Sequence, residues 1–317
     1  MIIVTGGAGF IGSNVINYLS NFYLKDLISV DWDNEKNSHY FKKSVTKISP
    51  EKLEVFLKKN SKNLELIIHL GAITSTTERN VGLINKNNLQ LSMFLWSWCV
   101  KHKKRFIYAS SAATYGNGSK NFDDLETDNY LSELFPLNIY GWSKHIFDRF
   151  VIKQKKKPPQ YVGLKFFNVY GPNEYHKRDM KSIALKIFEK IQTGKKIKLF
   201  KSHNPNYKDG EQLRDFIYVK DVLKIILWFI KKSKVSGIFN VGTGIPRSFN
   251  DLAHAVFKNT NKKKNLSYIN TPYKIRDQYQ YFTKANIEKL REVGFKDSFF
   301  SLEDGIRDYI RNHLYTK

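Results

Sequence analysis

The first fourteen residues constrain the fold more than any other stretch. Residues 1–4 are a short apolar run, which predicts a buried strand of a parallel sheet. Residues 5–12 contain four glycines, and an amphipathic helical pattern begins at Phe10. A turn without Cβ atoms lets backbone N–H groups approach a pyrophosphate, and the helix N-terminus adds partial positive charge. This strand, turn and helix predict a dinucleotide-binding site at Gly6, Gly9 and Gly12; a tight turn without a ligand is the alternative.

Strand and helix patterns alternate through the first half of the chain. Apolar runs predict strands at 27–31, 64–70, 105–109 and 161–166, and helical patterns lie at 50–60, 85–101 and 140–155. Such alternation predicts an α/β fold of the Rossmann type, with a doubly wound parallel sheet and right-handed crossovers. In such sheets the ligand lies at the carboxyl ends of the strands.

The second half is less regular, and 317 residues are long for a single core. Helices are predicted at 180–193, 220–232, 248–258 and 302–313, and strands at 215–219 and 237–242. We therefore expect a smaller C-terminal α/β substrate lobe that is interleaved with the Rossmann lobe. The predicted domains are 1–166 plus 214–243, which would bind NADP, and 167–213 plus 244–317, which would bind a nucleotide sugar.

The net charge of +24 raises the question of a nucleic-acid partner. The lysines stand in short groups such as 155–157 and 262–264, without the uninterrupted block of five or six that is typical of a basic arm. We therefore expect no nucleic-acid partner. The single cysteine excludes a disulfide framework, and no histidine or carboxylate cluster has metal-ligand spacing, so no metal is expected.

The chain begins directly with the predicted first strand, which leaves no room for a signal peptide. Its longest apolar runs, such as 225–230, are too short to span a bilayer. We expect a cytoplasmic protein without membrane contact.

Tyr140 and Lys144 lie four residues apart on a predicted helix and so share one face. An ammonium near the phenol should lower the pKa of the tyrosine from about 10. Ser111 and Thr114 follow the fourth strand and are expected to hydrogen-bond the reacting oxygen. Together these residues predict a hydride-transfer site with Tyr140 as the base; an exposed helical pair is the alternative.

Asp31 ends the second strand, where a carboxylate can accept from an adenosine ribose hydroxyl, which favours NAD. A carboxylate that only caps a turn is the alternative. Lysines downstream could neutralise the 2′-phosphate of NADP, so the residues leave the cofactor choice open. These lysines are Lys36, Lys42, Lys43 and Lys52.

Lys177 follows a predicted strand and turn, on a loop that should face the cleft. It could be a second acid/base opposite Tyr140, a phosphate anchor or a solvated lysine. The neighbouring His176 is expected to be a hydrogen-bonding loop residue. Arg214 suits a pyrophosphate clamp and Tyr279 could stack on a nucleotide, although each could also be a surface residue.

Four motifs, TGGAGFIGSN, ASSAATYG, YGWSK and FNVYGP, occur in this order and resemble the extended short-chain dehydrogenases/reductases that act on nucleotide sugars. Finer motifs, among them GAITSTTE, GPNEYHK and FKSH, resemble the ADP-L-glycero-D-manno-heptose 6-epimerase branch. The resemblance implies an NADP-dependent epimerase, with NAD possible, that acts on an ADP-heptose. It also implies a homo-oligomer, often a pentamer.

The resemblance implies catalytic roles for Tyr140, Lys177 and Ser111. The implied cofactor contacts are Phe10, Ile11, Asp31, Trp32, Lys52, Leu70, Gly71, Ala72, Ile73, Thr74, Asn87, Lys144, Val169 and Lys177. The implied substrate contacts are Ser111, Asn168, Asp179, Lys186, Phe200, Lys201, Ser202, His203, Arg214 and Tyr279.

Alternatives remain within and beyond this group. Another NAD(P)-dependent nucleotide-sugar epimerase would share the site. A 4,6-dehydratase would usually need an acidic pair beside Ser111, where this chain has Ala112 and Ala113. A cofactor-sensing protein without catalysis would tolerate the loss of Tyr140. Inversion of the configuration at one carbon with a single hydride source needs acid/base groups on two sides of that carbon. This requirement favours Lys177 as the second acid/base residue beside Tyr140.

Overall fold

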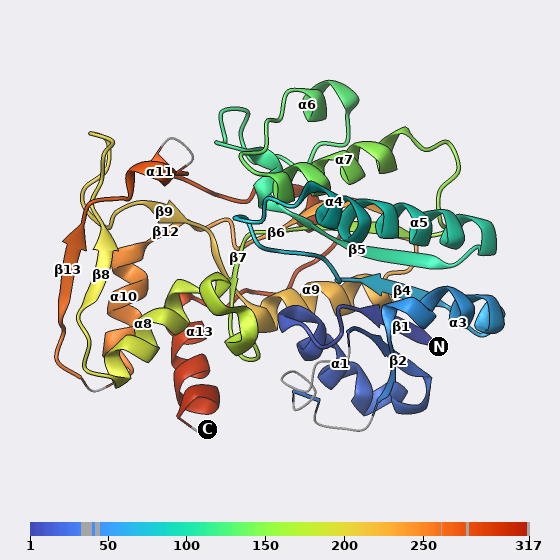
Figure 1. The fold of residues 1–317 in the computed structure, drawn as a ribbon, viewed down its shortest axis with the longest axis horizontal. Coiled ribbons are helices and arrows are strands. Elements are labelled where there is room, and N and C mark those ends of the chain that lie inside the picture. The colour runs from blue at the N-terminus through green and yellow to red at the C-terminus, as the bar shows by residue number, and fades with distance from the viewer. Residues whose placement is uncertain (33–39, 42–44, 261, 277–278, 316–317) are drawn as a thin grey trace.

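A computed structural model describes residues 1–317 except 33–39, 42–44, 261, 277–278 and 316–317. Its centre is a seven-stranded sheet in the order β11-β6-β5-β4-β1-β2-β3, and all neighbouring strands are parallel (Figure 1). This confirms the predicted Rossmann-type α/β fold. The strands are β1 (Ile2–Thr5), β2 (Leu27–Val30), β3 (Thr46–Ile48), β4 (Leu66–His69), β5 (Arg105–Ser111), β6 (Tyr161–Phe166) and β11 (Gly237–Val241).

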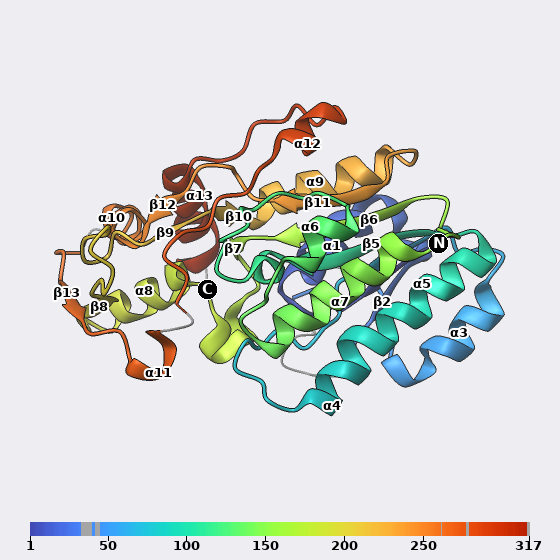
Figure 2. The same cartoon turned by 90° about the horizontal axis from the view of Figure 1, so that it is seen from above.

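Alternate residues of the strands enter two different cores, because successive side chains point to opposite faces of a sheet. Ile2 and Val4 of β1 pack with the helices α1 (Phe10–Tyr23) and α9 (Val219–Lys231). Ile3 packs into the core of the opposite face. The helices there are α3 (Leu53–Asn60), α5 (Leu91–His102) and α7 (Ile139–Lys153), and Figure 2 shows the sheet between them and α9.

Two local features differ from the sequence patterns. The short edge strand β3 was not predicted, because its residues are exposed or half-buried and carry no apolar signal. The helical pattern at 85–101 begins earlier, with α4 (Val81–Ile84), and a π-helical turn over 85–90 leads into α5.

The smaller lobe has its own core. Its helices α8 (Ile183–Gln192), α10 (Phe249–Lys258) and α13 (Leu302–Tyr309) bury one shared apolar cluster. Beside it the strands β8 (Ile197–Phe200) and β13 (Leu266–Ile269) pair in parallel. Two small ladders connect the lobes: β7 (Asn168–Tyr170) with β10 (Phe216–Tyr218), and β9 (Leu213–Arg214) with β12 (Arg247–Ser248).

The chain enters the smaller lobe after β6 and returns to the main sheet at β11. The domain boundaries at 166, 213 and 243 stay a prediction. The remaining helices are α6 (Asp128–Ser132), α11 (Tyr273–Arg276) and α12 (Glu288–Glu292), and short 3₁₀ or π turns lie at 24–26, 50–52, 112–115, 175–180 and 310–314. Among the helices in the described part of the chain, none has the length and apolar character to cross a bilayer.

Candidate active site

A cavity of about 570 Å³ lies at the carboxyl ends of the strands of the main sheet. This is where a doubly wound sheet binds its ligands. The structure brings most predicted site residues to its wall. They are Gly6, Gly9, Phe10, Ile11, Gly12, Asp31, Trp32, Leu70, Gly71, Ala72, Ile73, Thr74, Asn87, Ser111, Tyr140, Lys144, Asn168, Val169 and Lys177.

The glycine turn has no room for side chains. Gly6 has a φ of +66°, in the left-handed region that favours glycine. A Cβ atom on Gly12 would overlap the carbonyl oxygen of Gly6, because α1 begins directly against the turn. The turn therefore offers only backbone to this end of the cavity, which is the arrangement that lets a pyrophosphate approach closely.

Asp31 is fixed to the same turn. Its carboxylate accepts from the backbone N–H of Ala8 (2.9 Å) and of Trp32 (2.8 Å). Burial raises the pKa of this carboxyl, and these hydrogen bonds oppose the rise. Asp31 thus both caps a turn and lines the cavity. Lys52 is exposed and does not line the cavity, although its neighbours Pro50 and Leu53 do; Lys36, Lys42 and Lys43 lie outside the described residues.

The loop after β4 is tied to α7 by Asn88, which sequence reasoning missed. The buried amide of Asn88 accepts from the N–H of Ile73 (2.8 Å) and donates to its carbonyl (3.0 Å). It also donates to the hydroxyl of Ser143 on α7 (3.0 Å). The only signal was its position beside the predicted Asn87.

Tyr140 and Lys144 occupy the first turns of α7, as predicted. Asn138 caps the helix, because its side chain accepts from the N–H of Gly141 (2.8 Å). Tyr140 hydrogen-bonds Ser111, which comes from the end of β5. The ammonium of Lys144 donates to the carbonyl of Ala109 on the same strand (2.8 Å). A phenol, a hydroxyl and an ammonium therefore meet at one edge of the sheet.

Two expectations for this cluster are wrong. Burial raises the pKa of Tyr140, and the hydrogen bond from Ser111 opposes this rise, whereas Lys144 does not lower it. Burial also lowers the pKa of Lys144 to about 8. The expected role of Thr114 also fails, because its buried hydroxyl donates to the Ser111 carbonyl (2.8 Å) and accepts from Lys165 (2.7 Å), away from the cavity.

Lys177 lines the cavity from a second element, the 3₁₀ segment 175–180, which forms another flank of the cavity. Its ammonium lies 5.2 Å from the ring centroid of Phe10 and lines the cavity. Burial lowers the pKa of this amine, and the carboxylate of Glu174 opposes the change. The position is that of a cavity residue rather than a solvated lysine.

Glu174 anchors this flank, and sequence reasoning did not single it out. Its fully buried carboxylate accepts from the N–H of Gly171 (3.1 Å) and from both the N–H (2.5 Å) and the hydroxyl (2.7 Å) of Ser182. It also accepts from the hydroxyl of Tyr309 on α13 (3.2 Å). The segment that carries Lys177 is therefore fixed at both ends by one side chain.

The other predicted substrate contacts do not line this cavity. Arg214 lies with its guanidinium 5.4 Å from the ring centroid of Tyr279 and 5.6 Å from that of Phe249, which does line the cavity. Phe200 packs edge-on against Tyr279, with 6.0 Å between the ring centroids. The residues that lie away from the cavity wall are Lys52, Asp179, Lys186, Phe200, Lys201, Ser202, His203, Arg214 and Tyr279.

The predicted substrate contacts among these residues fall into two groups. Lys186 donates to the backbone carbonyl of Asp179 (2.5 Å), within the Lys177 segment. His203 accepts from the N–H of Thr271 through its ring (3.2 Å), and Thr271 donates to the carbonyl of Lys201 (3.1 Å). The second group thus forms a compact cluster in the smaller lobe that borders the cavity through Phe249.

Comparisons with known proteins identify the family of this chain. The model of the NAD dependent epimerase/dehydratase family matches residues 2–242. An ADP-L-glycero-D-manno-heptose-6-epimerase of Fusobacterium nucleatum is 43% identical and covers 99% of this chain and 98% of its own length. A protein of the same name from Brachyspira hyodysenteriae is 38% identical, with 98% and 96% covered.

Solved structures of epimerases have the same fold. The Helicobacter pylori ADP-L-glycero-D-manno-heptose-6-epimerase is 30% identical with a TM-score of 0.80, over 98% of this chain and 95% of that one. The Thermus thermophilus UDP-glucose 4-epimerase in complex with NAD shares the fold at 21% identity and a TM-score of 0.79, over 99% and 98%. The resemblance drawn from the motifs is confirmed, and with it the use of a nicotinamide cofactor: the chain belongs to the NAD-dependent epimerase/dehydratase family.

Proposed function

We propose that the protein interconverts ADP-D-glycero-β-D-manno-heptose and ADP-L-glycero-β-D-manno-heptose by transient oxidation at carbon 6. The observation that carries the proposal is that a tyrosine and a lysine from two separate elements line one cavity, Tyr140 from α7 and Lys177 from the 175–180 segment. Relatives at 38–43% identity over nearly the whole chain carry the name of this activity. The product would supply heptose for the lipopolysaccharide core.

The glycine turn and the cavity wall fit a dinucleotide. When bound, the nicotinamide supplies a reversible two-electron oxidation of the alcohol. The residues supply the proton transfers. In this proposal Tyr140 exchanges a proton with the carbon-6 hydroxyl, and Ser111, which hydrogen-bonds Tyr140, donates to the developing oxyanion.

Inversion needs a second proton carrier. After oxidation, rotation about the bond between carbons 5 and 6 presents the other face of the aldehyde to the same nicotinamide. The oxygen then points to the opposite flank, where Lys177 can exchange the proton. Burial, which lowers the pKa of Lys177, brings this amine closer to the range in which it can act as an acid or a base.

NADP is our proposed cofactor. The support is the resemblance of the motifs, together with Lys52, which stands between two cavity-lining residues, Pro50 and Leu53. The Asp31 carboxylate is already held by the N–H groups of Ala8 and Trp32. Denaturing the purified protein and identifying the released nucleotide tests this choice, and recovery of NAD alone would refute it.

We also propose that the cluster around Arg214 and Tyr279 holds the ADP moiety. A guanidinium can bind phosphate oxygens with two parallel hydrogen bonds. By the same resemblance the protein would act in the cytoplasm as a homo-oligomer. Light scattering tests whether it is a pentamer.

The direct experiment gives purified protein one ADP-heptose epimer and follows the mixture by NMR. We expect conversion to an equilibrium of both epimers without net consumption of NADP. Release of a dehydrated sugar would identify a 4,6-dehydratase. Stoichiometric accumulation of reduced cofactor would identify an ordinary dehydrogenase, and no reaction would refute the proposal.

A further inference from the structure

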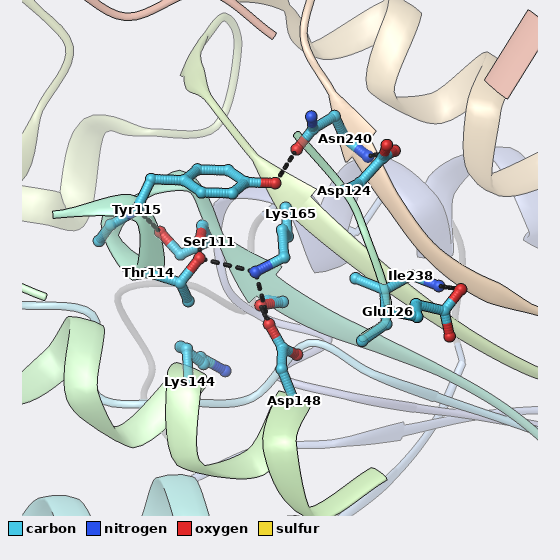
Figure 3. A network of polar contacts seen from close by, with 12 residues as sticks. Ser111, Thr114, Tyr115, Asp124, Glu126, Lys144, Asp148, Lys165, Ile238 and Asn240 are labelled. Atoms are coloured by element: carbon cyan, nitrogen blue, oxygen red, sulfur yellow. Dashed lines mark hydrogen bonds and ion pairs between the residues drawn. The ribbon is translucent and has the colours of Figure 1, made fainter. Parts of the chain in front are cut away.

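A buried ion pair lies next to the candidate catalytic residues (Figure 3). The ammonium of Lys165 on β6 lies 2.8 Å from the carboxylate of Asp148 on α7, and the two side chains are 1% and 0% exposed. Asp148 follows Lys144 by four residues, and Lys144 follows Tyr140 by four. The three therefore lie along one side of α7.

Both partners of the pair are bonded to the strand and turn that carry Ser111. The carboxylate of Asp148 accepts from the hydroxyls of Tyr108 (3.0 Å) and Ser110 (2.7 Å) on β5. Lys165 donates to the hydroxyl of Thr114 (2.7 Å), which in turn donates to the backbone carbonyl of Ser111. The pair thus contacts the backbone framework of Ser111 from two sides.

Stability gives a weak reason to keep such a pair. Removing two charges from water costs several kcal/mol per ion, and apolar residues of similar size often pack at least as well. Its location beside the reacting groups is therefore the feature that needs an explanation.

The charges near Tyr140 explain why the Asp148–Lys165 pair lies there. The other titratable groups facing the pair are kept neutral by burial: it raises the pKa of Tyr108 and of Tyr115 well above 10 and lowers that of His145 to about 4. The carboxylate of Asp124, on the loop before α6, accepts a hydrogen bond from the backbone N–H of Asn240 (2.8 Å). Of the charged groups in this network, Lys144 and Asp148 lie on the side of α7 that carries Tyr140, and Lys165 is paired with Asp148.

Asp148 acts against the ionisation of Tyr140, and it raises the pKa of Lys144. Without Lys165, the carboxylate would be free to attract the ammonium of Lys144 away from the Ala109 carbonyl. With Lys165 in place, Asp148 is neutralised and Lys144 remains as the net positive charge.

We propose, resting on the function proposed above, that Asp148 and Lys165 are positioning residues for the reaction. Lys165 neutralises Asp148, so that Lys144 keeps its place and its net positive charge beside Tyr140. Neither residue contacts the substrate in this scheme.

The test compares Lys165→Met with the double variant Asp148→Asn/Lys165→Met, each with NADP present. Lys165→Met should raise the pH at which Tyr140 ionises by about one unit, because it leaves Asp148 unpaired. The double variant should bring that pH back to the wild-type value, and Asp148→Asn alone should not raise it. The readouts are the NMR titration of selectively labelled tyrosine, assigned with Tyr140→Phe, and the pH dependence of kcat/KM for the epimer conversion.

Two controls separate positioning from simple support of the fold. Lys165→Arg keeps the charge and should keep the wild-type pH profile. Arg247→Met breaks the partly exposed pair of Arg247 with Glu303 (2.6 Å) in the smaller lobe, and should lower stability without moving the profile. If Lys165→Met does not fold, Lys165→Gln keeps a donor to Thr114 while removing the charge, and the same shift is expected.

An unchanged ionisation of Tyr140 in folded Lys165→Met or Lys165→Gln would overturn the inference, and so would a shift that persists in the double variant. The NMR titration does not depend on the sugar substrate. A protein that shows the shift but converts no ADP-heptose would therefore refute the proposed function alone.

Discussion

The two flanks of the cavity present the proposed acid/base residues in different ways. Tyr140 stands on the regular helix α7, with the Asp148–Lys165 pair beside it. Lys177 stands on a short 3₁₀ segment in which Arg178 has a φ of +46°, and a single buried carboxylate, that of Glu174, holds the segment. One flank is positioned by helical periodicity and the other by tertiary hydrogen bonds.

Burial acts on both flanks in the same sense. It raises the pKa of Tyr140 and lowers that of Lys177, so each group is shifted toward its neutral form. A neutral phenol can donate a proton and a neutral amine can accept one. Burial alone therefore favours the neutral forms of both proposed acid/base groups, which are a proton donor in the tyrosine and a proton acceptor in the lysine.

The largest effects should come from removing either group. Tyr140→Phe and Lys177→Met should each lower kcat by about 100-fold or more, the scale of a positioned acid or base. The measurement is the rate of epimer conversion, with NADP binding checked by fluorescence. A wild-type rate in Lys177→Met would show that the second flank takes no part in catalysis.

Glu174→Gln should weaken the Lys177 flank selectively. The amide offers one acceptor oxygen instead of two and directs an NH₂ group toward existing donors, at a cost of about 1–3 kcal/mol for each unsatisfied buried group. We expect kcat to fall about tenfold and the melting temperature to fall with it. The matched control is Glu189→Gln, which removes the more exposed ion pair of this α8 residue with Lys181 (2.6 Å), the residue after the segment, and should change little.

Arg214→Ala tests the cluster beyond the Lys177 flank. We expect KM for the nucleotide sugar to rise about tenfold, because a hydrogen bond to a charged group contributes about 1.5–3 kcal/mol, and kcat to stay nearly constant. Steady-state kinetics at fixed pH distinguish the two constants. A fall in kcat at constant KM would assign Arg214 to the reaction itself rather than to binding.

The smallest effect concerns Asp31, which is bonded to the glycine turn. Asp31→Asn removes a negative charge from the part of the cavity next to the glycine turn. Since a carboxylate repels a 2′-phosphate, the variant should favour NADP over NAD a few-fold more than the wild type does. Cofactor affinities measured by fluorescence titration check this, and an altered kcat would show that cofactor choice and the two flanks are not separable.

Local patterns predicted much of this molecule. The glycine turn could be predicted from its spacing alone. The strands of the main sheet except β3, and the Tyr140–Lys144 face of α7, follow the periods of strand and helix, which are visible within a few residues. The short strands β7, β8 and β13 were missed, because three or four residues carry too little of a period to be recognised.

The sequence by itself determined the Rossmann-type fold, the cofactor turn and the α7 face, because glycine geometry and apolar periodicity are local properties. Only the tertiary structure decided that Thr114 bonds Lys165 instead of the cavity, that Glu174 holds the Lys177 segment, and that burial raises the pKa of Tyr140 despite Lys144. These outcomes depend on which distant side chains share a buried volume, since burial and charge act through space rather than along the chain.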